Sequence, residues 1–442
     1  MYKECETDRS SSSQAIPKQY KAAALPTDLI EGGFNTEPPN TLEVRSENVS
    51  DASRADIVVA GALAVDYCCD FAPIPGQANQ STQLYTSNPA MIRQSLGGVA
   101  HNVAKAVHYC GRSVSLYSAV GNDLPGRIAL QQLASEGIQT SNIKSLPSAR
   151  TAQYVAVNDD KKDLVVAMAD MGILEQSNGL MPIWNEQLSI ARPSWFIADA
   201  NWEADALRSW FKNAKSYDAR TAFEPVSTAK ASRIFFGAKL VDIPVFPHHM
   251  VDLASPNALE LNSMHVAARS AGHLERQDWW AVIDALGIPS FGARSRFESA
   301  TSSDLTDQGI PQQSVQLLPF IPCILTKLGS KGVLLTMLLH KDDDRLRSAE
   351  AAPYIIARSR DDEPENRVGG VYMRLFAPAE IVADQDIVSV NGVGDTFLGA
   401  LIASMASSTR RVEDIVDFAQ RAAVLTLKSP EAVSPELRHL KW

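Results

Sequence analysis

The segment Val388-Ser389-Val390-Asn391-Gly392-Val393-Gly394-Asp395-Thr396-Phe397 carries the strongest structural signal in this chain of 442 residues. It predicts a strand that ends at two glycines spaced by one residue, with a helix that starts directly after them. Glycines leave backbone amides open to an anion, and the first turn of a helix adds unpaired N–H groups and the positive end of the helix dipole. The segment therefore predicts an anion-binding turn between a strand and a helix.

Asp395 lies where this turn enters the helix. A carboxylate repels phosphate, so its presence here is consistent with a base that accepts a proton from a hydroxyl attacking that phosphate. The alternative is an N-cap, which is common for aspartate before an apolar helix, and the segment alone favours that alternative. A dinucleotide-binding turn is disfavoured, because Phe397 stands where the third glycine is needed and Gly399 comes two residues late.

A second glycine turn, Leu96-Gly97-Gly98-Val99, precedes a helical pattern that ends at Gly111. This helix places Asn102 on its first turn, where a side-chain amide can donate and accept hydrogen bonds to substrate hydroxyls. The alternative is a polar side chain that faces water. Asp66 follows the first predicted strand, at 57–60, and a carboxylate there is suited to bind a pair of sugar hydroxyls.

Two further motifs are weaker. Asn257 and Glu260 are spaced so that an amide and a carboxylate lie on neighbouring turns of a helix, which suits phosphate and Mg²⁺, although this spacing is more common on a solvated helix face. Thr326, Gly329 and Gly332 mark the end of a strand and a glycine-flanked turn, which is able to contact a nucleotide through backbone and hydroxyl groups.

Strands and helices alternate along most of the chain. Short apolar runs predict strands at 57–60, 113–120, 195–198, 324–326 and 333–335, and helical patterns cover 128–136, 396–405 and 412–427. This alternation predicts an α/β fold with a mostly parallel sheet covered by helices on both faces. Two strand-like segments, 151–157 and 163–168, predict a β-hairpin that serves as a lid or as a dimer edge.

Composition excludes several classes of protein. The 45% hydrophobic and 21% charged residues exclude collagen-like and wholly disordered chains, and no apolar run approaches the ~18 residues of a membrane-spanning helix. The 41 basic and 51 acidic residues give a net charge of −10, which argues against nucleic acid as a partner. Five cysteines without metal-ligand spacing, and a start unlike a signal or transit peptide, favour a reducing, cytoplasmic setting without membrane contact.

Residues 1–54 are expected to form a disordered N-terminal tail, because they are polar and lack a sustained helix or strand period. The chain from 55 to 442 is expected to form one domain, with lid strands around 66–95 and 151–170. The polar segments 291–313 and 358–366 are expected to be surface insertions.

Taken together and in this order, the motifs resemble those of the PfkB (ribokinase-like) carbohydrate and nucleoside kinases. Gly97-Gly98-x-x-x-Asn102-Val103-Ala104 is similar to the N-terminal signature of the family, and Gly392-Val393-Gly394-Asp395-Thr396-Phe397 is similar to the C-terminal one. Asn257-x-x-Glu260 resembles the phosphate and magnesium element, and Thr326-x-x-Gly329-x-x-Gly332 resembles the strand on the nucleotide side. Ser389-Val390 depart from the Asp-Thr pair that often precedes the turn in this family.

The resemblance implies a Rossmann-like three-layer αβα sandwich with a small β-sheet lid over the sugar. It implies Asp395 as the catalytic base and the amides of Gly392, Val393 and Gly394 as the anion hole. The implied substrate contacts are Asp66, Gly97, Gly98, Asn102, Asp199 and Asn201. The implied nucleotide contacts are Asn257, Thr326, Gly329 and Gly332, with ATP as co-substrate and Mg²⁺ held indirectly by Glu260.

Several stretches are most similar to the pseudouridine kinase branch of this family: 86–90, 151–154, 168–171, 199–201 and 223–227. The expected reaction is ATP-dependent phosphorylation of the 5′-hydroxyl of a nucleoside, with pseudouridine as acceptor, and a homodimer through the lid is compatible with it. Ribokinase, adenosine kinase and fructokinase share the same core motifs and stay open as alternatives. A kinase-fold scaffold that no longer catalyses is another alternative, which the retained Asp395 disfavours.

Overall fold

The computed structural model describes residues 55–74, 81–83, 85–160, 164–288, 292–359 and 365–441. The tail expected at 1–54 lies outside these residues, as does most of the insertion expected at 358–366. Within the described ranges, each helix is too short or too polar to cross a membrane.

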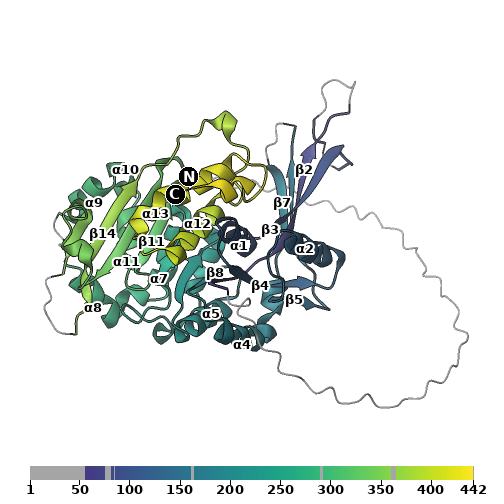
Figure 1. The fold of residues 1–442 in the computed structure, drawn as a ribbon. Coiled ribbons are helices and arrows are strands. Elements are labelled where there is room, and N and C mark those ends of the chain that lie inside the picture. The colour runs from purple at the N-terminus through teal and green to yellow at the C-terminus, as the bar shows by residue number, and fades with distance from the viewer. Residues whose placement is uncertain are drawn as a thin grey trace, which may run out of the picture. The chain divides into compact units, whose positions relative to one another are not determined.

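One sheet of ten strands forms the centre of the fold (Figure 1). From one edge to the other it runs β13 (Ile355–Arg358), β14 (Val368–Phe376), β12 (Val333–His340), β11 (Cys323–Lys327), β10 (Leu253–Ala254), β9 (Arg220–Glu224), β8 (Trp195–Asp199), β1 (Ile57–Ala60), β4 (Val114–Gly121) and β5 (Ile143–Leu146). The strands from β11 to β5 are parallel, whereas β12, β14 and β13 join antiparallel at one edge. The loops that leave the carboxyl ends of the parallel strands therefore meet at one edge of the sheet, where such folds bind ligands.

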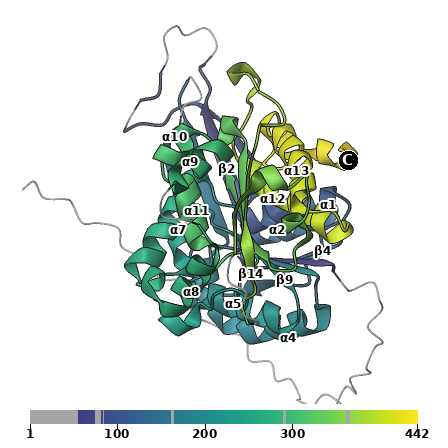
Figure 2. The same cartoon turned by 90° about the vertical axis from the view of Figure 1, so that its left-hand side faces the viewer.

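Helices cover both faces of this sheet, and Figure 2 shows the two layers on either side of β14. One face carries α1 (Val99–Tyr109), α2 (Leu124–Ser135), α12 (Val393–Ser407) and α13 (Val412–Leu427). The other carries α3 (Ile173–Gln176), α4 (Met181–Ala191), α5 (Ala204–Ser216), α6 (Thr228–Ala231), α7 (Ala258–Ser270), α8 (Gln277–Ala285) and α11 (Ile310–Leu317).

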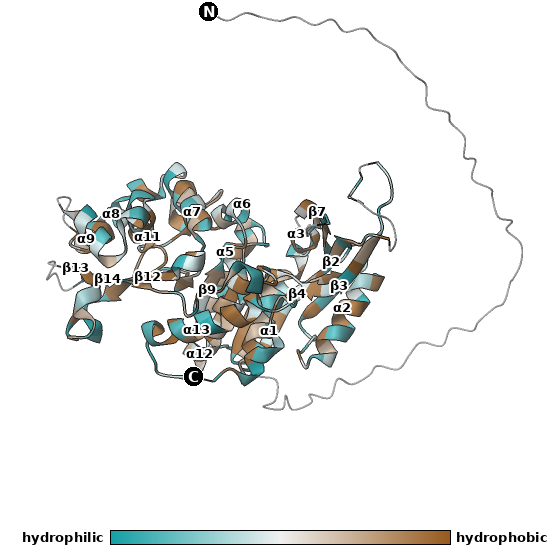
Figure 3. Cartoon of the chain, turned by 90° about the horizontal axis from the view of Figure 1, so that it is seen from above, coloured by the Kyte–Doolittle hydropathy of each residue, from teal (hydrophilic) through white to brown (hydrophobic). Residues whose placement is uncertain are grey.

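Successive residues of β1 face opposite sides of the sheet and so contribute to two hydrophobic cores. Val58 and Ala60 belong to the core on one face, Ile57 and Val59 belong to the core on the other face, and all four are fully buried. A strand that is buried on both faces is apolar throughout rather than alternating. Hydrophobic residues accordingly gather along the strands and on the helix sides that meet them (Figure 3). This arrangement confirms the predicted three-layer sandwich.

A second, smaller sheet rises beside α1 and α2 (Figure 1) and is called the lid sheet below. Its strands, in order, are β3 (Ala90–Gly97), β2 (Ala64–Phe71), β6 (Ala152–Asn158) and β7 (Leu164–Asp170). β6 and β7 pair antiparallel, which confirms the predicted hairpin. Because β2 begins four residues after β1 ends, the lid sheet starts at the edge where the parallel strands end.

Two expectations about local structure are wrong. The segment before Gly392 is not a strand: Val388 and Val390 are exposed, and the amides of Val388 and Ser389 donate to the carbonyl of Leu427 instead of to a sheet. β-propensity alone does not make a strand when the segment lies beyond the edge of the sheet.

The segment 291–313 is also not a simple surface insertion, because its described part forms α9 (Ala293–Ala300), α10 (Ser303–Asp307) and the start of α11. Phe297, Leu305 and Ile310 are buried in the core from this segment. Its many polar residues suggested a loop, but three well-spaced apolar side chains are enough to anchor short helices.

Candidate active site

The turn that precedes α12 is built around a glycine in the left-handed region. Gly392 is the N-cap of α12 with φ of 72°, and a Cβ at this position would overlap the carbonyl oxygen of Ala432. Only glycine fits both the angle and the space. The amides of Val393, Gly394 and Asp395 then form the open first turn, so that the positive end of the helix dipole lies here. The amides of Val393 and Gly394, two of the three assigned to the anion hole, thus lie in this first turn, and the anion hole stays a prediction.

Asp395 is the third residue of α12 and not its N-cap, which removes the alternative that the sequence favoured. Its carboxylate is buried, with 9% of the residue exposed, and Oδ2 accepts a hydrogen bond of 2.8 Å from Nδ2 of Asn102 on α1. Burial raises the pKa of Asp395 to about 6, against the opposing effects of the Asn102 hydrogen bond and the Lys327 charge. A carboxylate with this pKa is mostly ionised at neutral pH and still able to take a proton.

The second glycine pair makes room for Asp66. A Cβ on Gly97 would overlap the carboxylate of Asp66, and a Cβ on Gly98 would lie 2.5 Å from the carbonyl oxygen of Ala62. Burial, and then the negative charge of Asp395, raises the pKa of Asp66 to about 6. The structure therefore brings Asp66, Gly97 and Gly98 to the same place as Asn102 and Asp395, as the sequence predicted.

A cavity of about 680 Å³ opens beside this cluster and is called the α12 cavity below. Its polar lining comprises Glu224, Asn257, Glu260, Lys327, Ser330, Glu380, Asn391, Asp395 and Gln420, together with Gly329, Gly332, Gly392 and Gly394. Three of the four residues expected to contact a nucleotide, Asn257, Gly329 and Gly332, line this cavity. Apolar side chains of α13 complete the wall, namely Ala423, Val424 and Leu427.

Thr326 is the exception among the expected nucleotide contacts. It is fully buried within β11 and does not line the α12 cavity, whereas the next residue, Lys327, does. Successive side chains of a strand point to opposite faces, so only one of these two neighbours can face the cavity. The prediction chose the wrong member of the pair.

Asn257 and Glu260 form a capping box at the start of α7. Oδ1 of Asn257 accepts from the amide of Glu260 at 2.9 Å, and Oε2 of Glu260 accepts from the amide of Asn257 at 2.8 Å. Glu260 is 4% exposed, so it does not belong to a solvated helix face. The described residues contain no cluster of three side chains that would hold a metal unaided. Magnesium commonly uses one or two carboxylates together with substrate phosphates, and Glu260 fits that mode of binding.

Glu224 and Lys327 are site residues to which the sequence gave no role. Nζ of Lys327 lies 3.1 Å and 3.2 Å from the two carboxylate oxygens of Glu224, and Ser255 donates to Glu224 at 2.6 Å. Burial disfavours the lysine cation, but the charges of Glu224, Glu260 and Asp395 raise the pKa of Lys327 above its usual value. The raised pKa favours the charged form of this lysine.

Asp199 and Asn201, which the resemblance implied as substrate contacts, make hydrogen bonds to other protein groups. Asp199 is 1% exposed, and its Oδ2 accepts from the amides of Ala62 and Ala100 at 2.9 and 3.0 Å while Oδ1 accepts from the amide of Asn201. Oδ1 of Asn201 accepts from Nζ of Lys230 at 2.6 Å. Asp199 thus ties the turn before β2, the strand of Asp66, to the first turn of α1, the helix of Asn102.

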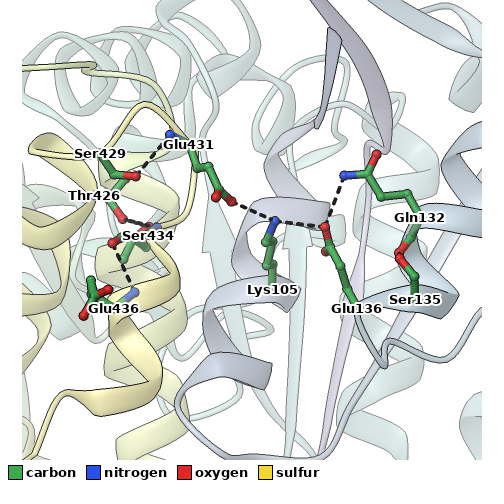
Figure 4. Close-up of polar contacts among 10 residues, drawn as sticks. Lys105, Gln132, Ser135, Glu136, Thr426, Ser429, Glu431, Ser434 and Glu436 are labelled. Atoms are coloured by element: carbon green, nitrogen blue, oxygen red, sulfur yellow. Dashed lines mark hydrogen bonds and ion pairs between the residues drawn. The ribbon is translucent and has the colours of Figure 1, made fainter.

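The loop 429–434 after α13 packs against the anion-binding turn, since the carbonyl oxygen of Ala432 would overlap a Cβ on Gly392. Figure 4 shows the polar contacts of Ser429, Glu431 and Ser434 in this loop. Oγ1 of Thr426 is 2.9 Å from Oγ1 of Thr396, the neighbour of Asp395, and it accepts from the amide of Ser434 at 3.1 Å. The amide of Glu431 donates to Oγ of Ser429. This loop contains Ala432, whose carbonyl packs against Gly392.

The same loop is tied to the N-terminal helices by a buried cation. Lys105 of α1 has a side chain that is 8% exposed, and its Nζ lies 3.1 Å from Glu136 and 3.5 Å from Glu431 (Figure 4). Glu136, Glu431 and the hydroxyl of Tyr109 contribute to raising the pKa of Lys105 against the effect of burial. The ion pairs therefore join α1, the end of α2 and the loop behind Gly392.

The sequence profile of one family, described as pfkB family carbohydrate kinase, matches residues 60–267 and 376–438. These ranges include both glycine turns, Asp66 and Asp395. The chain belongs to this family. Membership of the pfkB family agrees with the resemblance seen in the motifs, and the residues between the two matched ranges hold Lys327 and the antiparallel edge of the sheet.

The individual relatives of this pfkB family member share only a modest part of its sequence, with identities of 14–27% in the examples that follow. The pseudouridine-metabolizing bifunctional protein of Schizosaccharomyces pombe is 27% identical over 87% of this chain, which spans only 48% of that longer protein. A pseudouridine kinase of Arabidopsis thaliana is 24% identical, with 86% of this chain and 93% of that protein aligned. The ribokinase of Arabidopsis thaliana, solved with ribose and ATP, shares the fold with a TM-score of 0.54, 14% identity, and 88% and 99% of the two chains covered.

Proposed function

We propose that this chain is an ATP-dependent kinase that phosphorylates the 5′-hydroxyl of a nucleoside, with pseudouridine as the acceptor. The observation that carries the proposal is the position of Asp395, a buried carboxylate on the first turn of α12 that is held by Asn102. A base, an anion-binding helix start and a second carboxylate, Asp66, in one place suit phosphoryl transfer to a sugar hydroxyl. The names of the two pseudouridine-related proteins favour pseudouridine among the acceptors of this family.

The proposed reaction assigns one task to each group. Asp66 and Asn102 bind the sugar hydroxyls, and Asp395 accepts the proton of the 5′-hydroxyl as that oxygen forms its bond to the γ-phosphorus. The bond from the γ-phosphorus to the bridging oxygen of ATP breaks, and ADP leaves with the electron pair. The amides of Gly392, Val393 and Gly394 stabilise the charge on the transferring phosphoryl oxygens.

Magnesium is expected with the phosphates, where it neutralises their charge. Glu260 is the carboxylate that we propose to hold it, through water or directly, because this side chain lines the α12 cavity and needs only one of its oxygens for the capping box. The cytoplasmic setting and the lid-mediated dimer expected from the sequence stay predictions.

The proposal is tested by measuring ADP release with pseudouridine, uridine, adenosine, ribose and fructose as acceptors. We expect pseudouridine to give the highest kcat/KM. A preference for ribose, adenosine or fructose would keep the kinase and change the acceptor, and turnover with none of the five would reject the kinase in favour of a scaffold.

Asp395→Asn tests the base within the same assay. We expect it to lower kcat by a factor of at least about 10², the lower range for a general base, with nucleoside binding largely intact, because the amide keeps the shape but cannot take a proton. Turnover that survives this substitution would remove Asp395 from the role of base.

A further inference from the structure

Lys327 carries the positive charge nearest to the anion-binding turn among the described residues that line the α12 cavity. It is the last residue of β11, and its side chain is 17% exposed. A Cβ on Gly394 would lie 3.0 Å from Nζ of Lys327, so the ammonium lies directly beside the first turn of α12. The second glycine of the turn thus leaves room for this cation as well as for an anion.

The α12 cavity is lined by more acidic than basic side chains, which makes the charge of Lys327 important for binding an anion. Glu224, Glu260 and Asp395 each bring a carboxylate to its wall, and Lys327 is the one lysine or arginine among its described lining residues. A triphosphate that enters here meets a negatively charged wall, which the helix dipole offsets only in part. The cation that faces the transferring phosphoryl group has to be supplied by this side chain, beside any magnesium that accompanies the phosphates.

We propose that Lys327 is a catalytic residue whose ammonium binds the transferring phosphoryl group, and that Glu224 is the positioning residue that fixes it. This inference rests on the function proposed above. Lys327 stays protonated throughout and donates hydrogen bonds to the phosphoryl oxygens while the γ-phosphorus moves from the ADP oxygen to the acceptor oxygen. No proton leaves the lysine, since Asp395 takes the proton of the acceptor.

The competing explanation is that Lys327 only neutralises Glu224. A pair of substitutions separates the two explanations. Lys327→Met leaves Glu224 buried without its cation and is expected to destabilise the fold as well as the reaction. Lys327→Met combined with Glu224→Gln removes both charges, so a purely structural role predicts that stability and kcat recover together.

We expect stability to recover in this double variant and kcat to stay at least about 10²-fold below wild type, the size of effect seen when one preorganised donor is removed, with KM for the nucleoside within about threefold. Lys331→Met is the matched control, because Lys331 lies on the same turn, pairs with Asp304 and does not line the cavity; its kcat should match wild type. A double variant that regains the kcat of Glu224→Gln alone would overturn the proposal.

A second measurement does not depend on turnover. MgATP should raise the melting temperature of the wild type and of Lys331→Met, and the rise should be clearly smaller in the double variant. An equal rise in all three proteins would show that Lys327 does not contact the phosphates. If no acceptor is phosphorylated by the wild type, the proposed function fails, whereas this MgATP comparison still decides whether Lys327 binds phosphate.

Discussion

The buried carboxylate of Asp395 has an energetic cost as well as a chemical use. Its pKa is about 6 in the fold against 3.8 ordinarily, mainly because burial disfavours the charged form. Between these two values the folded state binds more protons than the unfolded state, so stability falls as the pH rises through this window. Above pH 6 the carboxylate is charged in both states, so the full free-energy cost of burying its charge opposes folding.

Asp395→Asn should therefore make the protein more stable at pH 7.5 while it lowers kcat. A pKa difference of this size corresponds to about 3 kcal/mol at most, and we expect an increase in melting temperature of roughly 2–5 °C. The gain in melting temperature over the wild type should be smaller at pH 5, where the wild-type carboxylate is mostly protonated. If the variant melts at or below the wild-type temperature at pH 7.5, the buried charge of Asp395 does not destabilise the fold.

The residues that the sequence revealed are those whose neighbours in the chain mark a turn. Asp395 and Asn102 each follow a glycine pair within a few positions, and both were found. Glu224 and Lys327 pair across 103 positions, and although Lys327 precedes the turn of Gly329 and Gly332, no sequence signal links it to Glu224, so their ion pair shows only once β9 and β11 are placed in the same sheet. Asp199 was given a substrate role only through the resemblance to the pseudouridine kinase branch, which does not show whether its carboxylate binds a ligand or protein backbone.

At the scale of elements, the site depends on how closely α1 and α12 cross. A Cβ on Gly399 would lie 2.6 Å from Cβ of Ala106 and 2.7 Å from the carbonyl oxygen of Val103. The glycine that came too late for a dinucleotide-binding turn thus lets two helices approach, and this approach brings Asn102 to hydrogen-bond distance of Asp395.

Gly399→Ala should push these helices apart. Overpacking of a close core contact typically costs about 1–3 kcal/mol, and a displacement of about 1 Å between reacting groups can cost 10²-fold in rate. We expect a loss of stability of that size in urea unfolding and a kcat lowered by at least tenfold. Gly179→Ala is the matched control, since a Cβ there meets nothing within 4 Å, and equal behaviour of the two variants would contradict the role of the crossing.

Elements with a clear pattern of apolar residues in the sequence were predictable, whereas a strand that forms only because its neighbours in the sheet flank it was not. The strands at 57–60 and 195–198 and the helix at 412–427 agree closely with β1, β8 and α13. β10 has two residues, Leu253–Ala254, and exists because β9 and β11 flank it. Such a strand has no period of its own to detect.

At the scale of the whole molecule, Lys105 joins three parts of the chain that are far apart in sequence. It has carboxylate partners from the end of α2 and from the loop behind Gly392. Lys105→Met leaves Glu136 partly buried without its cation, and we expect a loss of about 3 kcal/mol in the free energy of unfolding. kcat should fall with it, because the loop that supports the anion-binding turn loses its tie to α1.

Urea unfolding of Lys105→Met, beside Arg294→Gln as control, checks this expectation. Arg294 pairs with Asp307 on the surface, where each side chain is 61% exposed, so solvent screens the pair and its loss should change the stability little. If the two substitutions cost the same, the buried ion pairs do not hold the molecule together. Removal of Glu136 as well, by Glu136→Gln, should restore part of the stability lost in Lys105→Met.

The hydrogen bond between Asn102 and Asp395 spans 293 positions of the chain, which has a consequence for biosynthesis. Ribosomes add roughly 5–20 residues per second, so about 15–60 s pass between the appearance of the two partners. Throughout that interval the side of α1 that α12 later covers has no permanent neighbour, which makes the nascent chain a natural client for chaperones. The proposed base therefore reaches Asn102 only after residue 395 has been synthesised.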